Sequence, residues 1–340
     1  MPPPVLNSLS QRVLPVLQLT RMALVFTAIA DSTCGLFLRA ARDQRLSGGG
    51  FLTHLDKYQV IATAIISVGL YGYGMSLNDI IDRRRDSQIA SHRPLPSGRI
   101  GVVTAHIICF LLALSAVLGG IFFVYSRAMN GWATLILVVA TGLLITFYDS
   151  AGKYLVAPGL ISLGLIRFFH CIIPAPYIPL LWHPLLLLNH VAILSTVAYV
   201  WEQKRPALTP LHWWAVLGGL AFIDAAAIGL LAWRRPESLL IQPGLMLAGA
   251  AVLLFIAVAM IIHKRMGLRR EAGQTLMLYG LLWLIVYDAA FAAGYVNWLA
   301  ACMLLLLAPV AYLSVQLMRW WSKLLIASHR PDYKRAGREA

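Results

Sequence analysis

This sequence is poor in charge: Asp, Glu, Lys and Arg make up 12% of its 340 residues, and only 14 residues are acidic. Soluble proteins carry about twice that charged fraction. Hydrophobic residues account for 59%, and the mean hydropathy is +0.74. The scarcity of charge excludes an ordinary soluble domain and predicts a protein that crosses a membrane several times.

Cysteine is also scarce, since Cys34, Cys109, Cys171 and Cys302 lie far apart, each within an apolar stretch and none in a C-x-x-C pair. This distribution predicts small residues buried in the core. The sequence also lacks H-E-x-x-H, C-x-x-C-H, G-x-G-x-x-G and Walker-type patterns. Zinc, haem and nucleotide sites therefore have no support from local motifs.

Ten apolar stretches are close to the length of about 20 residues that crosses a hydrocarbon core of about 30 Å. The fifth is the weakest because it contains Pro174, Pro176 and Pro179, and neighbouring helices must then satisfy the freed backbone groups. We predict an all-α, polytopic transmembrane bundle of nine to ten spans. The stretches cover residues 18–38, 58–77, 101–124, 131–149, 158–180, 186–203, 211–233, 240–262, 275–294 and 297–318.

The chain is expected to form one membrane domain over residues 1–320, followed by a basic cytoplasmic tail over 321–340. Residues 1–18 lack the pattern of a cleavable signal peptide, so we expect the first span to be an uncleaved anchor. No linker rich in Gly and Ser separates two soluble domains.

Charge placement predicts the orientation, because Lys and Arg concentrate in cytoplasmic loops. With ten spans and both ends inside, most of the 28 basic residues fall in cytoplasmic segments, while Arg39, Arg42 and Arg45 fall in an outer loop. The net charge of +14 is spread over alternate loops, which favours contact with membrane lipids and argues against nucleic acid. We expect a bacterial inner-membrane protein whose active site faces the cytoplasm.

A row of oxygen ligands follows the second span, where Asn78, Asp79, Asp82 and Asp86 form the pattern N-D-x-x-D-x-x-x-D. On one helix these residues share a face, because three of them recur at intervals of four residues. Magnesium is usually held by one or two carboxylates together with substrate phosphates, so the row favours a magnesium-diphosphate site. The alternative is a solvated loop whose acidic side chains pair with the arginines at 83–85.

The stretch N-D-I-I-D-R-R-R-D-S-Q-I-A-S-H-R-P-L-P-S-G-R-I resembles the first aspartate-rich motif of the UbiA family of intramembrane prenyltransferases. The resemblance extends over residues 15–320 and implies a UbiA-like membrane fold with Mg²⁺ as cofactor. It also implies an isoprenoid (prenyl) diphosphate donor and an aromatic or other lipophilic acceptor. On this resemblance Asn78, Asp79, Asp82 and Asp86 hold metal, the three aspartates are catalytic, and Arg93 binds the diphosphate.

A second family feature is a Tyr and a Lys at the end of the fourth span, where the Lys contacts the donor diphosphate. Tyr148 and Lys153 resemble this pair, with four intervening residues where the family commonly has three. The resemblance implies that Tyr148 binds substrate and that Lys153 is catalytic. The alternative for Lys153 is a side chain that only reaches the membrane interface. Arg21 and Arg167 are cations inside apolar spans, where such residues usually have a partner or a task, and we expect both to bind substrate.

The second acidic motif of the family is degenerate in this chain, which reads Y-V-W-E-Q-K-R-P after the sixth span. Either Glu202 carries a second metal alone, or Lys204 and Arg205 replace the charge of that metal against the diphosphate. A third interpretation is a UbiA-like protein that no longer catalyses prenyl transfer. The W-E-Q-K-R-P form is similar to a divergent EboC-like subgroup, associated with bacterial secondary-metabolite operons.

Asp31, Asp224 and Asp288 are lone carboxylates inside predicted spans, and we expect each to hydrogen-bond across helices because an unpartnered one is costly. A proton relay through them, joined by His170 and His190, is the alternative and would make the protein a membrane transporter of a lipophilic metabolite. Phosphatidyl transfer from CDP-alcohols is excluded, since its spaced D-G, A-R, G and Asp pattern is absent.

Overall fold

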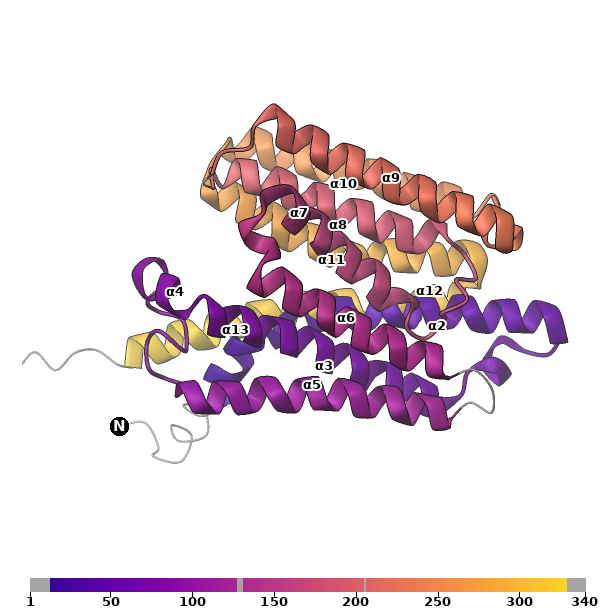
Figure 1. Ribbon diagram of the computed structural model, residues 1–340, viewed down its shortest axis with the longest axis horizontal. Coiled ribbons are helices and arrows are strands. Elements are labelled where there is room, and N and C mark those ends of the chain that lie inside the picture. Colours follow the sequence, from indigo (N-terminus) through magenta and orange to yellow (C-terminus); the bar gives the residue numbers. More distant parts are fainter. Residues whose placement is uncertain (1–12, 127–130, 205, 329–340) are drawn as a thin grey trace, which may run out of the picture.

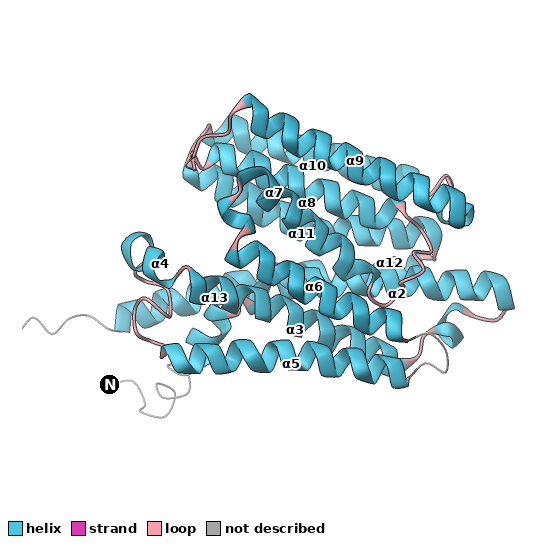
Figure 2. Ribbon diagram, in the orientation of Figure 1, coloured by secondary structure: helices cyan, strands magenta, loops and turns pink. Residues whose placement is uncertain are grey.

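The computed structural model describes residues 13–126, 131–204 and 206–328, and these residues form helices joined by loops (Figure 2). Nine of the described helical segments are long and apolar enough to cross a membrane, and a tenth apolar helix is shorter. The prediction of an all-α bundle of nine to ten spans is confirmed. The long segments are α2 (Val25–Ser47), α3 (Lys57–Ile81), α5 (Val102–Tyr125), α6 (Trp132–Ser150), α8 (Trp182–Trp201), α9 (Pro210–Arg234), α10 (Leu245–Met266), α11 (Arg270–Tyr295), and α12 (Trp298–Leu305) taken together with α13 (Leu307–Ser328).

Helix α2 lies at the centre of the bundle, where it packs against α3, α11, α13 and the shorter helix α7 (Val156–Ile172) (Figure 1). Helix α3 packs against α5 and α6, while α8 packs against α7 and α11. The α3–α5 crossing is close because Gly69 has no side chain: a Cβ there would lie 2.7 Å from the backbone nitrogen of Ala116. Small residues allow membrane helices to approach in this way.

The fifth predicted span, 158–180, is only partly helical. Helix α7 ends at Ile172, and the prolines at 174, 176 and 179 follow in a loop. Proline cannot continue a helix, because it lacks the amide hydrogen and its ring clashes with the preceding turn. Side chains of neighbouring helices hydrogen-bond the backbone carbonyls of this loop. Thr134 donates to the carbonyl of Ile173 at 3.0 Å, and Arg39 donates to that of Pro174 at 2.8 Å.

The first span was predicted at 18–38, but the helix begins at Val25 and continues to Ser47. Arg39, Arg42 and Arg45 therefore belong to α2, and their assignment to a loop was wrong. Arg39 is buried within α2, where it donates hydrogen bonds to Pro174 and Gln59. The helix extends past the apolar stretch because these partners accept the guanidinium inside the bundle.

Candidate functional site

The acidic motif lies where α3 ends and α4 (Arg83–Ile89) begins. A single helix was expected through residues 78–86, but Asp82 leaves helical geometry, with φ −78° and ψ 0°. The register continues across this junction, since the amide of Asp82 donates to the carbonyl of Asn78 at 2.9 Å and that of Asp86 donates to Asp82 at 2.8 Å. The four-residue hydrogen-bond repeat of the motif therefore continues from α3 into α4, although regular helical geometry is interrupted at Asp82.

Arg93 connects two buried carboxylates of this motif. Its Nη1 lies 2.6 Å from Asp86 Oδ2 and 3.5 Å from Asp79 Oδ1, and both aspartates are nearly inaccessible to solvent. Arg21 Nη2 contacts the same Asp79 Oδ1 at 3.1 Å. Among the ion pairs of the described residues, none joins these carboxylates to the arginines at 83–85, so the local pairing considered as an alternative is not what the structure shows.

Lys153 completes the cluster from the short helix η3 (Gly152–Tyr154) that follows α6. Its Nζ lies 2.8 Å from Asp82 Oδ1 and 3.5 Å from Asn78 Oδ1, and the lysine side chain is only 10% exposed. Tyr148, on the last turns of α6, lies within electrostatic range of Asp82 and Arg21. Lys153 therefore points into the cluster rather than out to the membrane interface.

The donor set of this cluster fits a hard divalent cation, because it consists of carboxylate and amide oxygens. Asp79 and Asp86 both contact the guanidinium of Arg93, which lies between their carboxylates. A cation held by these two carboxylates would take the place of that guanidinium and free Arg93 to contact a phosphate. The residues present thus suit magnesium in their chemistry, and Asp79 and Asp86 converge on one position of positive charge.

The degenerate second motif lies just beyond α8. Glu202 follows the last residue of that helix, and Lys204 Nζ lies 3.2 Å from its Oε2. Arg85 of α4 lies within electrostatic range of Tyr199 of α8, so both motifs belong to the same end of the bundle. Within the described chain no hydrogen bond or ion pair joins Glu202 to the acidic cluster. Arg205 lies outside the described residues.

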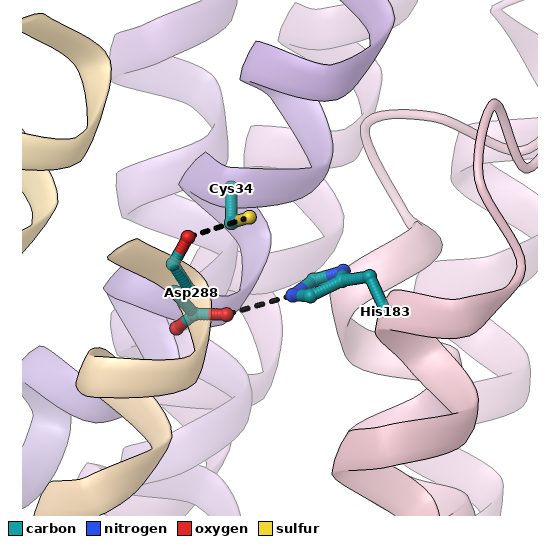
Figure 3. A group of neighbouring side chains, drawn as sticks. All are labelled: Cys34, His183 and Asp288. Carbon is teal, nitrogen blue, oxygen red and sulfur yellow. Dashed lines mark hydrogen bonds and ion pairs between the residues drawn. The ribbon is translucent and has the colours of Figure 1, made fainter. Parts of the chain in front are cut away.

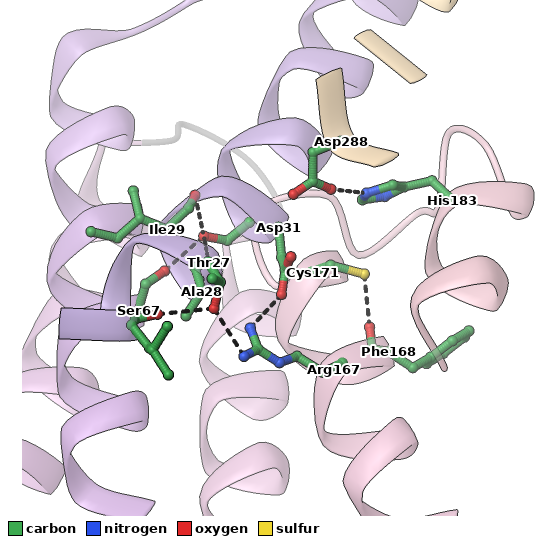
Figure 4. Close-up of polar contacts among 12 residues, drawn as sticks. Thr27, Ala28, Ile29, Asp31, Ser67, Arg167, Phe168, Cys171, His183 and Asp288 are labelled. Carbon is green, nitrogen blue, oxygen red and sulfur yellow. Dashed lines mark hydrogen bonds and ion pairs between the residues drawn. The ribbon is translucent and has the colours of Figure 1, made fainter. Parts of the chain in front are cut away.

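Arg167 forms a separate pair deeper in the bundle, where its Nη1 lies 2.5 Å from Asp31 Oδ2 and its Nη2 donates to Thr27 Oγ1 at 3.1 Å (Figure 4). The structure therefore places this predicted substrate-binding residue in a buried ion pair, away from the acidic cluster.

The lone carboxylates all have partners on other helices, as predicted. Asp31 pairs with Arg167, Asp224 accepts from Asn189 at 3.0 Å, and Asp288 lies 2.7 Å from His183 Nε2.

Comparison with known proteins shows a relationship in structure. No family model and no curated protein matches this chain. A solved structure described as "Structural and mechanistic insights into the biosynthesis of Digeranylgeranylglyceryl phosphate synthase in membranes" matches with a TM-score of 0.56 and 19% identity, covering 83% of this chain and 98% of that one. The chain has a UbiA-like fold. At this identity the likeness shows the fold alone.

Two structures of a UbiA homolog from Archaeoglobus fulgidus also match, each over 92% of this chain and 99% of that chain. The one bound to DMAPP and Mg²⁺ has a TM-score of 0.45 at 13% identity, and the one bound to GPP and Mg²⁺ has 0.44 at 12%. The EboC-like subgroup stays a prediction from the sequence.

Sequence reasoning missed one prominent polar residue, His183. It is fully buried at the start of α8 and contacts Asp288, which lies 105 residues further along the chain. Its neighbours Trp182 and Pro184 carry no recognisable motif. Only the packing of α8 against α11 brings this pair together.

Proposed function

We propose that this protein is a magnesium-dependent prenyltransferase that acts within the membrane. It transfers a prenyl group from an allylic diphosphate to an aromatic or other lipophilic acceptor. The observation that carries the proposal is the cluster at the end of α3, where the acidic motif meets Arg21, Arg93 and Lys153. Oxygen ligands for a hard cation and basic groups for a diphosphate stand side by side there, in a bundle with a UbiA-like fold.

In this proposal Asn78, Asp79, Asp82 and Asp86 hold the cation, and Arg93 and Lys153 exchange a carboxylate for a diphosphate oxygen. Magnesium, when bound, supplies positive charge that stabilises a departing diphosphate. Lys153 is suited to the exchange because it is nearly buried and already held by one short contact to Asp82. Hydrogen bonds between charged partners are about twice as strong as neutral ones. The contacts of Arg93 and Lys153 with the diphosphate therefore strengthen as negative charge develops on this leaving group.

The remaining predicted residues have supporting roles in this proposal. Arg21 fixes Asp79 through its ion pair, and Tyr148, near the end of α6, contributes to donor binding. At the second motif, either Glu202 offers one carboxylate to a second metal, or Lys204 and Arg205 replace the positive charge of that metal against the diphosphate.

The apolar helices around the cluster suit the rest of the reaction. An allylic cation must be kept from water until the acceptor attacks, and in this proposal the acceptor meets it between the apolar helices. A prenyl chain is itself a hydrocarbon, so lying between these helices removes its surface from water at no polar cost.

The proposal is tested by incubating the purified full-length protein with a panel of allylic diphosphates, with and without magnesium. Donor binding and diphosphate release are followed separately. We expect both to require magnesium, and the double variant Asp82→Asn/Asp86→Asn to lose both by more than about a hundredfold, since each lost charged contact contributes about 1.5–3 kcal/mol. Asp224→Asn, which changes a carboxylate whose partner among the described residues is Asn189, is the matched control.

The outcomes separate the alternatives. Magnesium-dependent binding without release of diphosphate would indicate a UbiA-like protein that has lost catalysis. A transporter would show the opposite sensitivity to mutation. Replacing Asp31 or Asp288 would abolish its function, whereas Asp82 and Asp86 could be replaced without loss of function.

A further inference from the structure

A second cluster of reactive side chains lies inside the bundle, apart from the acidic motif. Cys34 of α2, His183 of α8 and Asp288 of α11 point toward one another (Figure 3). One ligand atom from each lies within 4.8 Å of the other two, and all three side chains are buried. In the described part of the chain this is the one group of three or more His, Cys, Asp or Glu residues with such spacing.

The contacts within this cluster leave polar capacity unused. His183 Nε2 lies 2.7 Å from Asp288 Oδ1, and the thiol of Cys34 donates to the backbone carbonyl of Asp288 at 3.5 Å. Asp288 Oδ2 has no hydrogen-bond partner among the described residues, although Asp288 is fully buried. Buried polar atoms are nearly always satisfied, so this oxygen requires a proton or a cation that no hydrogen bond among the described residues supplies.

Asp31 adds a second unsatisfied oxygen next to the cluster. Its Oδ2 is held by Arg167, but its Oδ1 has no partner among the described residues (Figure 4). Asp31 and Asp288 are drawn near each other in the bundle interior in Figure 4. Two buried carboxylates that face each other need a proton or a cation between them.

We propose that Cys34, His183 and Asp288 bind a zinc-class divalent cation, with Asp31 as the carboxylate beside its fourth position. Thiolate, imidazole and carboxylate are the three ligand types of protein zinc sites, and three protein ligands leave one position open in a tetrahedral site. Sulfur and nitrogen ligands disfavour magnesium and calcium, which take oxygen ligands. The unsatisfied oxygens of Asp288 and Asp31 then have a cation, or a cation-bound water, as their partner.

Charge balance supports a divalent cation at this place. Without metal, Cys34 keeps its proton and is neutral. Asp31 and Asp288 share one proton, so together they carry one negative charge. The positive charge of Arg167 offsets it, and the site as a whole is neutral. A divalent cation that displaces both of these protons leaves the total charge unchanged. The bundle interior therefore gains no uncompensated charge, which would be costly in an apolar environment.

This site is separate from the acidic motif and does not depend on the proposed function. Among the described residues no ion pair joins the two clusters, and about 28 Å of helix, at 1.5 Å per residue, separates His183 from Glu202 of the second motif. A metal here would join α2, α8 and α11, whose ligands come from positions up to 254 residues apart. A metal bound there would therefore stabilise the packing of these three helices.

The test uses the full-length protein in detergent, stripped with a chelator and reloaded with Zn²⁺ or Co²⁺. We expect one Zn²⁺ per chain to remain after desalting and the Co²⁺ form to show thiolate-to-cobalt charge-transfer absorption. Loading should also release about two protons per metal, as ligand deprotonation requires. Cys34→Ser should abolish the absorption, whereas Cys109→Ser and Cys302→Ser, which change cysteines outside the cluster, should keep it.

Two further variants separate this site from the magnesium site. His183→Gln should lower Zn²⁺ affinity at least about tenfold, whereas Asp82→Asn should leave the cobalt absorption unchanged. Wild-type protein that shows no thiolate absorption and retains no Zn²⁺ would overturn the proposal, whatever the folding of the variants. Zn²⁺ retained equally by wild type and His183→Gln would overturn it as well.

Discussion

At the scale of single residues, the acidic cluster is held by contacts between distant parts of the chain. Arg21 and Asp79 are 58 residues apart, and Lys153 and Asp82 are 71 apart. Carboxylates that are buried and paired with cations stay ionised only while those cations are present. We therefore expect each basic residue of the cluster to affect both the stability of the site and its affinity for a ligand.

The first prediction concerns Lys153. Lys153→Ala should weaken binding of an allylic diphosphate by about 10- to 100-fold, because one charged hydrogen bond contributes about 1.5–3 kcal/mol. Isothermal titration with magnesium present measures the change. Lys57→Ala is the control, since Lys57 begins α3 at the opposite end from the motif. Equal affinities of Lys153→Ala and the wild type would remove this lysine from the binding site.

The second prediction concerns the buried pair of Arg167 and Asp31. Arg167→Met leaves a carboxylate buried without its cation and should lower the free energy of unfolding by about 3–5 kcal/mol. Adding Asp31→Asn removes the unpaired charge, so the double variant should recover much of that loss. Denaturant unfolding in detergent measures both. A double variant as unstable as the single one would mean that Arg167 stabilises the bundle by packing and not by charge.

The sequence predicted those residues whose partners are marked by a local pattern. The four-residue spacing placed Asn78, Asp82 and Asp86 on one face, and the resemblance to a family motif placed Arg93 and Lys153 near them. His183 was beyond reach, because its partners Cys34 and Asp288 lie on helices whose neighbours in space are set by packing. No periodicity within α8 distinguishes His183 from an ordinary buried histidine.

At the scale of helices, the sequence predicted how many spans there are better than where they end. Hydropathy marks the apolar part of a helix, but α2 continues through Arg39 because Pro174 and Gln59 accept its guanidinium. The opposite happens at α7, which stops at Ile172 although apolar residues continue. At α2 the helix continues because the side chain of Arg39 hydrogen-bonds other segments, which a single sequence does not specify. At α7 the helix ends before prolines that the sequence already shows.

The third prediction tests the close crossing of α3 and α5, which sets the direction of the helix that ends in the acidic motif. Gly69→Ala places a methyl group 2.7 Å from backbone and side-chain atoms of α5 and should destabilise the protein by about 1–3 kcal/mol. Gly249→Ala in α10 meets nothing within 4 Å and should be neutral or stabilising by up to about 1 kcal/mol. Thermal unfolding of the two variants, compared in one detergent, measures the difference. Equal melting temperatures would mean that α5 can shift aside freely.

At the scale of the whole molecule, α2 connects the two polar centres. Arg21 precedes this helix and contacts Asp79, while Asp31 and Cys34 lie on it and face the interior cluster. Because α2 packs against α3, α7 and α11, any tilt of this helix moves residues at both centres. We therefore expect the interior cluster to hold the scaffold on which the acidic site is built.

The last prediction concerns the orientation of the bundle in the membrane. Basic residues concentrate in the segment that follows the acidic motif, so this segment should lie in the cytoplasm. In a background lacking Cys302, Ser97→Cys should react with a membrane-impermeant maleimide only after cells are opened, whereas Ser47→Cys should react in intact cells. Both serines are exposed, and they lie on opposite sides of the span formed by α3. Each variant is its own control, because labelling is compared before and after lysis. Labelling of Ser97→Cys but not Ser47→Cys in intact cells would place the acidic cluster outside, away from a soluble cytoplasmic supply of allylic diphosphate, and would contradict both the orientation and the proposed reaction.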